Sequence, residues 1–305
     1  MTKQNADWIA VDWGTSTLRA WLMAADGTVL ERRRSDSGMG ALAHAEFEPA
    51  LLALIGDALS CDRVIPVVCC GMVGSRQGWA EAPYASVPCA PPGIAQATQV
   101  AGSDPRIAAF ILPGIKQNSP ADVMRGEETQ IAGVLAADPD FDGILCLPGT
   151  HTKWVHISAG EIVSFRTFMT GEMFALLSGQ SVLRHSVAAE GWDEDAFENA
   201  VSDAMSRPER VAAALFSLRA ETLLNGLSGA SARACLSGLL IGTELAAARP
   251  YWLGQAVRIV GAEAIAAPYL AALQAQAADV TAIADEEITL RGLMRAYATL
   301  PETVE

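Results

Sequence analysis

Two short segments rich in glycine and threonine carry groups that bind phosphate. In the first, "VDWGTSTLRAWL" (residues 11–22), an apolar run ends in a carboxylate and a tight turn follows: Asp12, Gly14, Thr15, Ser16 and Thr17. Backbone amides and small hydroxyls at such a turn suit an oxyanion, and a neighbouring carboxylate suits a metal ion. The segment predicts either a phosphate-binding turn with Mg²⁺ at Asp12 or a surface hairpin in which Asp12 caps the turn.

A second segment, "ILCLPGTHTKWVHISAGEIVSFRT", repeats this pattern later in the chain. Its turn consists of Gly149, Thr150 and Thr152, followed by Lys153, and has the spacing of the first turn. Leu147 stands where the first segment has its aspartate, so only one of the two turns carries a carboxylate. Two such turns can bind a polyphosphate from opposite sides. Lys153 either contacts phosphate or points to solvent, as does Arg19 of the first segment.

Alternating strand-like and helix-like segments must position these turns, and such alternation is typical of an α/β protein. Strands are expected at 8–13, 18–25, 28–35, 64–70, 107–112, 143–148, 152–158, 161–168, 256–261 and 280–284. Helices are expected near 46–60, 122–137, 171–178, 193–205, 208–224, 231–248, 263–277 and 286–298. The proline-rich stretch 75–106 is expected to be mostly irregular loop.

Composition excludes several classes of function. The 305 residues carry a net charge of −14, which argues against nucleic-acid binding because phosphate backbones need clustered lysine and arginine. The basic run 32–34 follows a predicted strand and is expected to be a solvated edge. Neither the cysteines nor the histidines show metal-ligand spacing. No leader or membrane segment is recognised, so we expect a cytoplasmic protein with no membrane partner.

Nucleotide-binding motifs of other folds are not found: the chain has no GxxxxGK[ST] and no GxGxxG between a strand and a helix. The two turns instead resemble those of the actin-like ATPase superfamily, which includes sugar kinases, heat-shock chaperones and actin. The resemblance implies an α/β fold of two ribonuclease-H-like lobes with a cleft between them. We expect the first lobe at 1–121 together with a C-terminal helix at 286–305, and a second, nucleotide-binding lobe at 122–285.

Further segments resemble one family within this superfamily, the 2-oxo-3-deoxygalactonate kinases. They are "DSGMGAL" (36–42), "CGMVGSRQGWAEAPY" (70–84), "DVMRGEETQIAG" (122–133), "LPGTHTKWV" (147–155), "TGEMFALLS" (170–178), "SGLLIGTEL" (237–245) and "IVGAEAIAAPYLAAL" (259–273). The resemblance implies an ATP- and Mg²⁺-dependent kinase of the C6 hydroxyl of 2-dehydro-3-deoxy-D-galactonate, whose 6-phosphate product feeds D-galactonate breakdown. It also assigns Gly238, Gly261 and Ala262 to the nucleotide, although a glycine at a strand–helix corner is common without one.

Because the protein is acidic, the carboxylate of a sugar acid needs a positively charged side chain nearby in order to bind. Arg76, within the glycine-rich "GMVGSRQGW", is a candidate for bidentate contact with the carboxylate, or else an exposed loop arginine. Trp79 either walls the site or packs in the core. Other candidates for substrate contact follow a predicted strand or lie within one: Ser37, Gly38, Met39 and Arg166.

Glu127 and Glu128 are the candidates for the base that accepts the proton of the sugar hydroxyl. They precede Ile131 by four and three residues, on the side of the expected helix that carries Met124, Val134 and Leu135. The superfamily resemblance favours Glu127, because an acidic residue follows a glycine there, although many relatives have aspartate. The alternative is that both acids only complement the helix dipole.

Three alternatives stay open at this stage. The first is a kinase for another small sugar acid on the same fold, because the residues cannot fix the stereochemistry at C4 of the substrate. The second is a non-kinase actin-like ATPase, disfavoured because the chain has no room for a chaperone's peptide-binding domain. The third concerns assembly, where a homodimer is as compatible with the sequence as a monomer.

Overall fold

The computed structural model describes residues 6–102, 104–283 and 285–299, and the chain divides into two compact units. Unit 1 comprises Met1–Phe141, Ser158–Ser164 and Asp285–Glu305. Unit 2 comprises Asp142–Ile157 and Phe165–Ala284. The predicted second lobe begins at residue 122, whereas the structure groups residues 122–141 with unit 1.

The main sheet of unit 1 is built around the strand that ends at Asp12. Its order is β3 (Val29–Ser35), β2 (Leu18–Met23), β1 (Trp8–Trp13), β4 (Ile65–Cys70), β7 (Ile107–Ile111) and β6 (Thr98–Gln99). The first three strands form an antiparallel meander, β4 and β7 run parallel to β1, and β6 pairs antiparallel with β7. The predicted strands are confirmed here with ends displaced by a residue or two, apart from the short β6.

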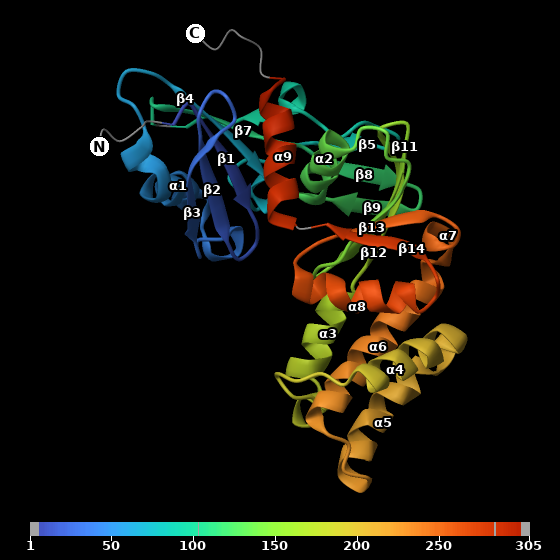
Figure 1. The fold of residues 1–305 in the computed structure, drawn as a ribbon. Helices are drawn as coiled ribbons and strands as arrows, with labels where there is room; N and C mark the ends of the chain where they lie inside the picture. Colours follow the sequence, from blue (N-terminus) through green and yellow to red (C-terminus); the bar gives the residue numbers. More distant parts are fainter. Residues whose placement is uncertain (1–5, 103, 284, 300–305) are drawn as a thin grey trace. The chain divides into compact units, whose positions relative to one another are not determined.

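Both faces of this sheet are covered, which explains why β1 is an almost continuous apolar run. Ile9 and Val11 belong to one cluster with Phe47 of α1 (Phe47–Ile55). Trp8 and Ala10 belong to another with residues of α9 (Asp285–Tyr297). Figure 1 shows these two helices on opposite sides of the sheet. Because side chains alternate along a strand, Asp12 points to the α9 side, at the end of that buried row.

A second, three-stranded sheet of unit 1 was not predicted. Its strands are β5 (Tyr84–Ser86), β8 (Gly114–Asn118) and β9 (Ala121–Met124), in segments expected to be loop or helix. The helix expected at 122–137 therefore begins only at Glu127, as α2 (Glu127–Ala137). Gly126, with φ of 107°, separates strand from helix in a backbone conformation that favours glycine. Met124, predicted on the helix, is instead a buried strand residue.

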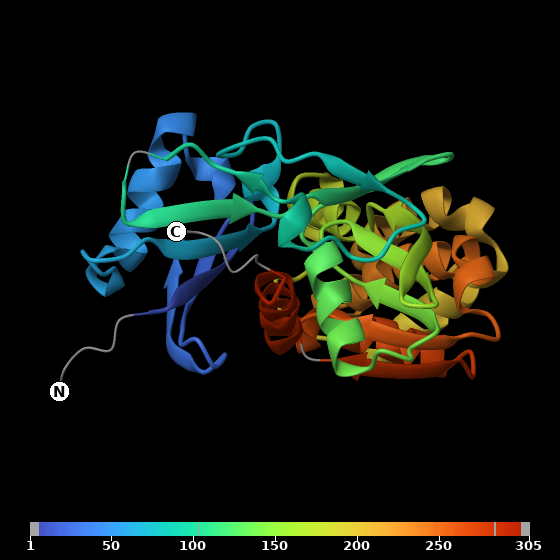
Figure 2. The ribbon, with the colours of Figure 1, turned by 90° about the horizontal axis from the view of Figure 1, so that it is seen from above.

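Helices α2 and α9 lie side by side in unit 1 (Figure 1 and Figure 2). Glycines make the close approach possible on both helices. A Cβ on Gly133 would lie 1.9 Å from the carbonyl oxygen of Ile288, and one on Gly292 would lie 1.9 Å from that of Thr129. Since Thr129 lies in the first turn of α2, this packing fixes the start of the helix that carries the two candidate bases.

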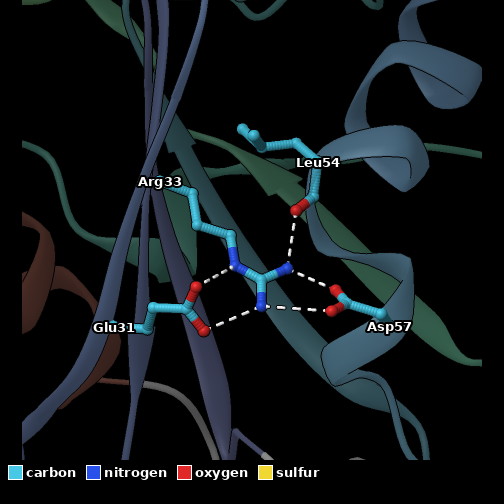
Figure 3. A network of polar contacts seen from close by, with 4 residues as sticks. All are labelled: Glu31, Arg33, Leu54 and Asp57. Atoms are coloured by element: carbon cyan, nitrogen blue, oxygen red, sulfur yellow. Dashed lines mark hydrogen bonds and ion pairs between the residues drawn. The ribbon is translucent and has the colours of Figure 1, made fainter.

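The basic run at 32–34 is not simply a solvated edge. The side chain of Arg33 is only 12% exposed and forms ion pairs with Glu31 and Asp57. It also donates a 2.7 Å hydrogen bond to the carbonyl oxygen of Leu54 at the end of α1 (Figure 3). The two carboxylates raise the pKa of Arg33. This arginine therefore joins the edge strand β3 to α1.

A five-stranded sheet, which belongs to unit 2 apart from residues 158 and 161–164, repeats the order of the first five strands of the main sheet of unit 1. Its order is β12 (Glu161–Phe168), β11 (Thr152–Ser158), β10 (Gly143–Leu147), β13 (Ala256–Val260) and β14 (Asp279–Ile283). Here too β10 and β11 are antiparallel, whereas β13 and β14 run parallel to β10. The shared strand order confirms that the repeated sequence reflects a repeated structure.

Helices make up the remainder of unit 2, with α4 packed on α6 (Figure 1). They are α3 (Thr170–Gly179), α4 (Glu194–Ser206), α5 (Val211–Leu224), α6 (Gly229–Ala247), the short α7 (Arg249–Trp252) and α8 (Glu263–Gln274). Short 3₁₀ helices of the two units lie at Met39–Ala41, His44–Glu46, Gly56–Ala58, Met72–Gly74, Ile94–Gln96, Val182–His185 and Pro208–Arg210. Among the described residues, no helix has the length and apolarity needed to span a bilayer.

Candidate active site

The first glycine–threonine turn connects β1 and β2 in unit 1. The amide of Gly14 donates a 2.9 Å hydrogen bond to the carbonyl oxygen of Thr17, and the side chains of Thr15 and Ser16 are exposed at the tip. Asp12 lies opposite Arg19 in the strand register and forms an ion pair with it. The turn therefore presents exposed hydroxyls, while Arg19 neutralises the carboxylate beside them.

Residues 37–39, predicted as substrate contacts, lie against this turn. The amide of Met39 donates to the carbonyl oxygen of Gly14 at 3.0 Å, and Trp13 donates its indole N–H to the carbonyl oxygen of Ser37 at 2.9 Å. Gly38 has no room for a side chain, because a Cβ there would lie 2.3 Å from the backbone of Ser16. Small residues in this segment thus allow two backbones to touch.

A pocket of about 180 Å³ in unit 1 brings several candidate residues together. It is lined by Asp12, Gly14, Gly71, Met72, Arg125, Gly126, Glu127, Gln130 and Thr289. These residues come from the ends of β1 and β4, the start of α2 and the first half of α9. Gly71, with φ of 92°, and Gly126 approach closely, so that a Cβ on Gly126 would lie 3.3 Å from the Cα of Gly71. The pocket thus places the first turn next to a candidate base.

The structure separates the two adjacent glutamates. Glu127 lines the pocket, and its Oε2 accepts a 3.0 Å hydrogen bond from the amide of Arg125. Glu128 is 1% exposed, and both of its carboxylate oxygens accept from the amide of Gly126, at 2.8 and 2.7 Å. Burial, and then the charge of Glu127, raise the pKa of Glu128 to about 8. Only Glu127 is therefore placed to meet a molecule in the pocket.

Arg125 also lines this pocket and was not singled out from the sequence. It is 9% exposed and donates a 2.7 Å hydrogen bond to the carbonyl oxygen of Ala82, while its guanidinium stacks 4.3 Å from the ring centre of Tyr84. Its Nε and Nη1 have no hydrogen-bond partner among the described residues. Its positive charge offsets part of the rise in the pKa of the neighbouring Glu128. This arginine ties the loop after β4 to the start of α2.

Other predicted substrate residues of the chain lie elsewhere. The side chain of Arg76 is 82% exposed, with Glu81 at 3.8 Å as a loose ion-pair partner. Trp79 is 6% exposed and packs edge-on against Trp13, so it belongs to the core of unit 1. Arg166 is an exposed residue of β12 in unit 2. It is not among the described residues that line this pocket or the pocket of unit 2 described below.

The second glycine–threonine turn lies between β10 and β11 in unit 2. Gly149 and Thr150 are accessible, and the first turn of α3 packs directly against them. The amide of Glu172 donates to the carbonyl oxygen of Thr150 at 2.9 Å, and a Cβ on Gly171 would lie 2.1 Å from the carbonyl oxygen of Gly149. His151 Nε2 lies 2.6 Å from the carboxylate of Glu172. The turn is thereby fixed to a helix N-terminus.

The later residues of this turn are buried beneath it. Thr152 is 0% exposed and Lys153 is 5% exposed, so neither presents its side chain as openly as Thr150. The hydroxyl of Thr152 lies 2.9 Å from that of Tyr269 on α8. Of the residues predicted to contact phosphate at this turn, Gly149 and Thr150 are therefore the accessible ones.

Tyr269 continues into a buried network around Glu244 of α6. Glu244 accepts hydrogen bonds from the indole N–H of Trp154 at 2.7 Å, from the hydroxyl of Tyr269 at 2.9 Å, and from the hydroxyl of Thr170. Burial raises the pKa of Glu244, and these hydrogen bonds offset part of the rise. The network joins β11, α3, α6 and α8 below the turn.

A pocket of about 340 Å³ in unit 2 begins at this turn. It is lined by Gly149, Thr150, Thr170, Gly171, Phe174, Trp192, Arg233, Ser237, Leu240, Ile241, Ala264, Ile265, Pro268 and Tyr269. Gly261 and Ala262 precede the first turn of α8, whose Ala264 and Ile265 line the pocket. Gly238 instead faces α4, because a Cβ there would lie 2.5 Å from the carbonyl oxygen of Phe197. Its role is helix packing, and the neighbouring Ser237 lines the pocket.

Solved structures of distant proteins share this architecture. The activator of the 2-hydroxyisocaproyl-CoA dehydratase of Clostridium difficile matches with a TM-score of 0.51 and 11% identity, over 95% of this chain and 93% of that chain. Component A of the (R)-2-hydroxyglutaryl-CoA dehydratase of Acidaminococcus fermentans also has a TM-score of 0.51, with 12% identity, over 95% and 97% of the two chains. The protein therefore has the fold of the actin-like ATPases and sugar kinases, as predicted.

Within that class the family is defined by closer relatives. The family model described as 2-keto-3-deoxy-galactonokinase matches residues 12–296, and the chain belongs to this family. It is 36% identical over 292 residues to the 2-dehydro-3-deoxygalactonokinase of Escherichia coli (strain K12), covering 95% of this chain and 97% of that protein. It is 41% identical over 296 residues to a protein of Rhizobium meliloti (strain 1021) named as the probable 2-dehydro-3-deoxygalactonokinase DgoK1, covering 94% and 95%.

A crystal structure of a relative agrees closely over the whole fold. A Sinorhizobium meliloti protein, provisionally described as a 2-dehydro-3-deoxygalactonokinase, matches with a TM-score of 0.89 and 39% identity. The match covers 96% of this chain and 99% of that chain. The predicted family is thus confirmed, and membership in a kinase family implies the use of ATP.

Proposed function

We propose that this protein transfers the γ-phosphoryl group of ATP to the C6 hydroxyl of 2-dehydro-3-deoxy-D-galactonate, forming the 6-phosphate in D-galactonate breakdown. The observation that carries the proposal is the pocket of unit 1, where Asp12 and Gly14 lie beside Glu127. A phosphate-binding turn next to a carboxylate base is the arrangement that phosphoryl transfer to an alcohol needs. The family and the names of its members supply the substrate class.

Glu127 is the proposed base. Its carboxylate accepts the proton of the sugar hydroxyl while that oxygen forms a bond to the γ-phosphorus and ADP leaves with the electrons of the broken bond. Glu128, buried and held by the amide of Gly126, orients the start of α2 and does not touch the substrate. The amide of Arg125 fixes the position of the Glu127 carboxylate.

The residues of unit 1 fit a Mg²⁺ ion that is shared with the nucleotide. Mg²⁺ keeps several waters and uses one or two protein carboxylates together with phosphate oxygens. Among the described residues no cluster of three or more His, Cys, Asp or Glu forms a protein-only cage, whereas Asp12 lies in the pocket next to the first turn. Asp12 would hold the ion through water, and the ion would supply charge neutralisation at the phosphates.

The phosphates and the sugar acid are assigned to separate groups. Thr15, Ser16 and Thr17 at one turn and Gly149 and Thr150 at the other bind phosphate oxygens, and the base and ribose occupy the pocket of unit 2. Arg76 is the proposed contact for the substrate carboxylate, since its side chain is exposed and Glu81, its ion-pair partner among the described residues, lies 3.8 Å away. Residues 37–39, which lie against the first turn, complete the substrate side.

Incubation of the purified protein with ATP, Mg²⁺ and a panel of sugar acids tests the proposal, with the product located by ³¹P NMR. We expect rapid ADP release only with 2-dehydro-3-deoxy-D-galactonate, and a phosphate ester at C6. Transfer to a different sugar acid alone would move the protein to another substrate. ADP release at the same rate without any acceptor would identify a non-kinase ATPase.

A further inference from the structure

The lining of the pocket in unit 2 has an unusual set of polar side chains. Among the described residues that line it, none is aspartate, glutamate, asparagine, glutamine or histidine. The apolar part consists of Phe174, Leu240, Ile241, Ala264, Ile265 and Pro268. The pocket therefore offers a nucleotide base extensive apolar and aromatic contact, and few side-chain acceptors.

Several of the polar groups that are present already have partners. Thr170 and Tyr269 donate their hydroxyls to Glu244. The indole N–H of Trp192 donates to Glu194 at 2.8 Å. Thr150 belongs to the turn assigned to phosphate. Arg233 and Ser237 are then the polar side chains left to face a base.

Arg233 differs from an amide side chain in that it can only donate hydrogen bonds. Its guanidinium lies 5.1 Å from the ring centre of Phe174, and Nη1 donates to the carbonyl oxygen of Ala188 at 3.3 Å. The side chain is half-buried and lines the pocket. Such a donor suits the C6 carbonyl of guanine or hypoxanthine and gives no hydrogen bond to the C6 amino group of adenine.

We propose that this pocket holds the purine by stacking and apolar contact, with donors from Arg233, so that GTP and ITP serve as phosphoryl donors alongside ATP. The proposal rests on the proposed function, in which the pocket of unit 2 binds the nucleotide. A site rejects an analogue strongly only when the wrong ligand leaves buried polar groups unpaired, whereas an apolar pocket discriminates by about 10–200-fold. Among the described residues that line this pocket, the hydroxyl of Ser237 is the side-chain acceptor left to face a base, and no amide side chain offers the paired donor and acceptor that would select adenine.

The test is a comparison of kcat/KM for ATP, GTP and ITP with 2-dehydro-3-deoxy-D-galactonate as acceptor. We expect GTP and ITP to fall within about 200-fold of ATP, because this is what apolar contact alone permits. A preference for ATP larger than about 200-fold would overturn the proposal, since it would require an acceptor that reads the amino group.

Substitution of Arg233 tests its part directly. Arg233→Met keeps an apolar stem against Phe174 and removes the donors, so kcat/KM should fall more for GTP and ITP than for ATP, by about tenfold or more. Arg249→Gln, which changes an exposed arginine of α7 in the same unit, should leave the ratios unchanged. An equal loss with all three nucleotides in Arg233→Met would show that Arg233 does not read the base.

Calorimetric titration with ADP, GDP and IDP separates this inference from the proposed function. Tight binding of ADP and phosphoryl transfer from ATP, without binding of GDP or IDP, would refute the relaxed base selectivity and leave the kinase assignment intact. Absence of both nucleotide binding and transfer to any sugar acid would refute the proposed function itself.

Discussion

The chemistry proposed for unit 1 depends on individual carboxylates, and one of these is that of Asp12. In the free protein its carboxylate forms an ion pair with Arg19. Asp12→Asn keeps the size of the side chain and removes its charge. Turnover should fall by about 10²–10³ while the sugar acid still binds, because one preorganised electrostatic contact is lost. Asp62→Asn, on an exposed loop of the same unit, is the matched control and should be neutral.

The rate should be measured at saturating Mg²⁺, with the fold checked by circular dichroism. Turnover of Asp12→Asn close to that of the unchanged protein would rule out Asp12 as the group that positions the ion.

Glu127 and Glu128 are adjacent in sequence and opposite in surroundings, so a matched pair of variants distinguishes them. Glu127→Gln should lower kcat by about 10²–10⁴ and leave the affinity for ADP unchanged, because only proton transfer is lost. Glu128→Gln retains an oxygen that accepts from Gly126 and should lower kcat far less. The reverse result would move the base to Glu128, and full activity in both variants would place the base outside α2.

The buried position of Glu128 also makes stability depend on pH. Its pKa is about 8 in the folded protein and close to 4.5 in the unfolded chain, so between these values the folded state retains a proton that the unfolded state has released. Raising the pH therefore favours unfolding. The stabilisation by Glu128 is fully present at a pH below its pKa in the unfolded chain. It is lost as the pH rises through its pKa in the folded protein.

Denaturant titrations between pH 5 and pH 9, on the unchanged protein and on Glu128→Gln, measure this contribution. The free energy of unfolding of the unchanged protein, relative to the variant, should fall by up to about 1.4 kcal/mol per pH unit within that window. The difference should become constant above the folded pKa. A difference that does not change with pH would show that Glu128 is ionised in both states.

At the scale of elements, sequence patterns identified the strands of both main sheets, apart from the two-residue β6, and most helices. Apolar runs such as those of β1 and β4 are easily recognised in the sequence because both faces of their sheet are buried. The small sheet β5–β8–β9 was missed because its strands are only 3, 5 and 4 residues long and two of them are largely unburied, as in the pattern of Ala121–Met124. Gly126 carries the signal that ends the strand, but a glycine alone does not reveal its φ.

Candidate site residues that are close together in the sequence were predicted, whereas those that the fold brings together from separate segments were missed. The two turns and Glu127 were found from motifs. Trp192, Arg233 and Ile265 come from three separate segments of unit 2, and no local pattern marks them as neighbours. Gly238 was misassigned for the converse reason, because a glycine required by helix packing looks the same in sequence as one required by a ligand.

The packing of α2 on α9 gives a prediction for this pair of helices. In Gly292→Ala the new Cβ would meet the carbonyl oxygen of Thr129 at 1.9 Å, so the helices must separate. We expect a loss of about 1–3 kcal/mol in stability, as for overpacked cores, and a decrease in kcat because the first turn of α2 is displaced. Thermal unfolding and steady-state kinetics measure the two effects.

Gly56→Ala serves as the control, because no atom lies within 4 Å of the added Cβ and the backbone there is right-handed helical. It should be neutral or stabilising by up to about 1 kcal/mol. Equal melting temperatures for the two variants would show that the helix contact tolerates an extra methyl group.

For the whole molecule, the repeated sequence is the most informative feature. It predicted three matching strands and a glycine–threonine turn in each half, and the structure has these and extends the shared order to five strands. The two turns then diverged in their surroundings. The first retains a carboxylate and lies beside Glu127 of α2, whereas the second has Leu147 at that place and adjoins a largely apolar pocket. In the proposed function, the first unit therefore carries the reacting groups and the second holds the nucleotide.

This division predicts how each ligand should protect the chain from hydrogen exchange. With ADP alone, exchange should slow most in unit 2, at residues 149–152 and 170–175, because the nucleotide pocket lies entirely within that unit. With 2-dehydro-3-deoxy-D-galactonate alone, exchange should slow in unit 1, at residues 36–40, 71–76 and 125–128, which lie at the first turn, the loop after β4 and the start of α2. Mass-spectrometric exchange at matched ligand saturation measures both patterns. Protection by ADP confined to unit 1 would contradict the assignment of the nucleotide pocket, and protection by the sugar acid confined to unit 2 would contradict that of the substrate site.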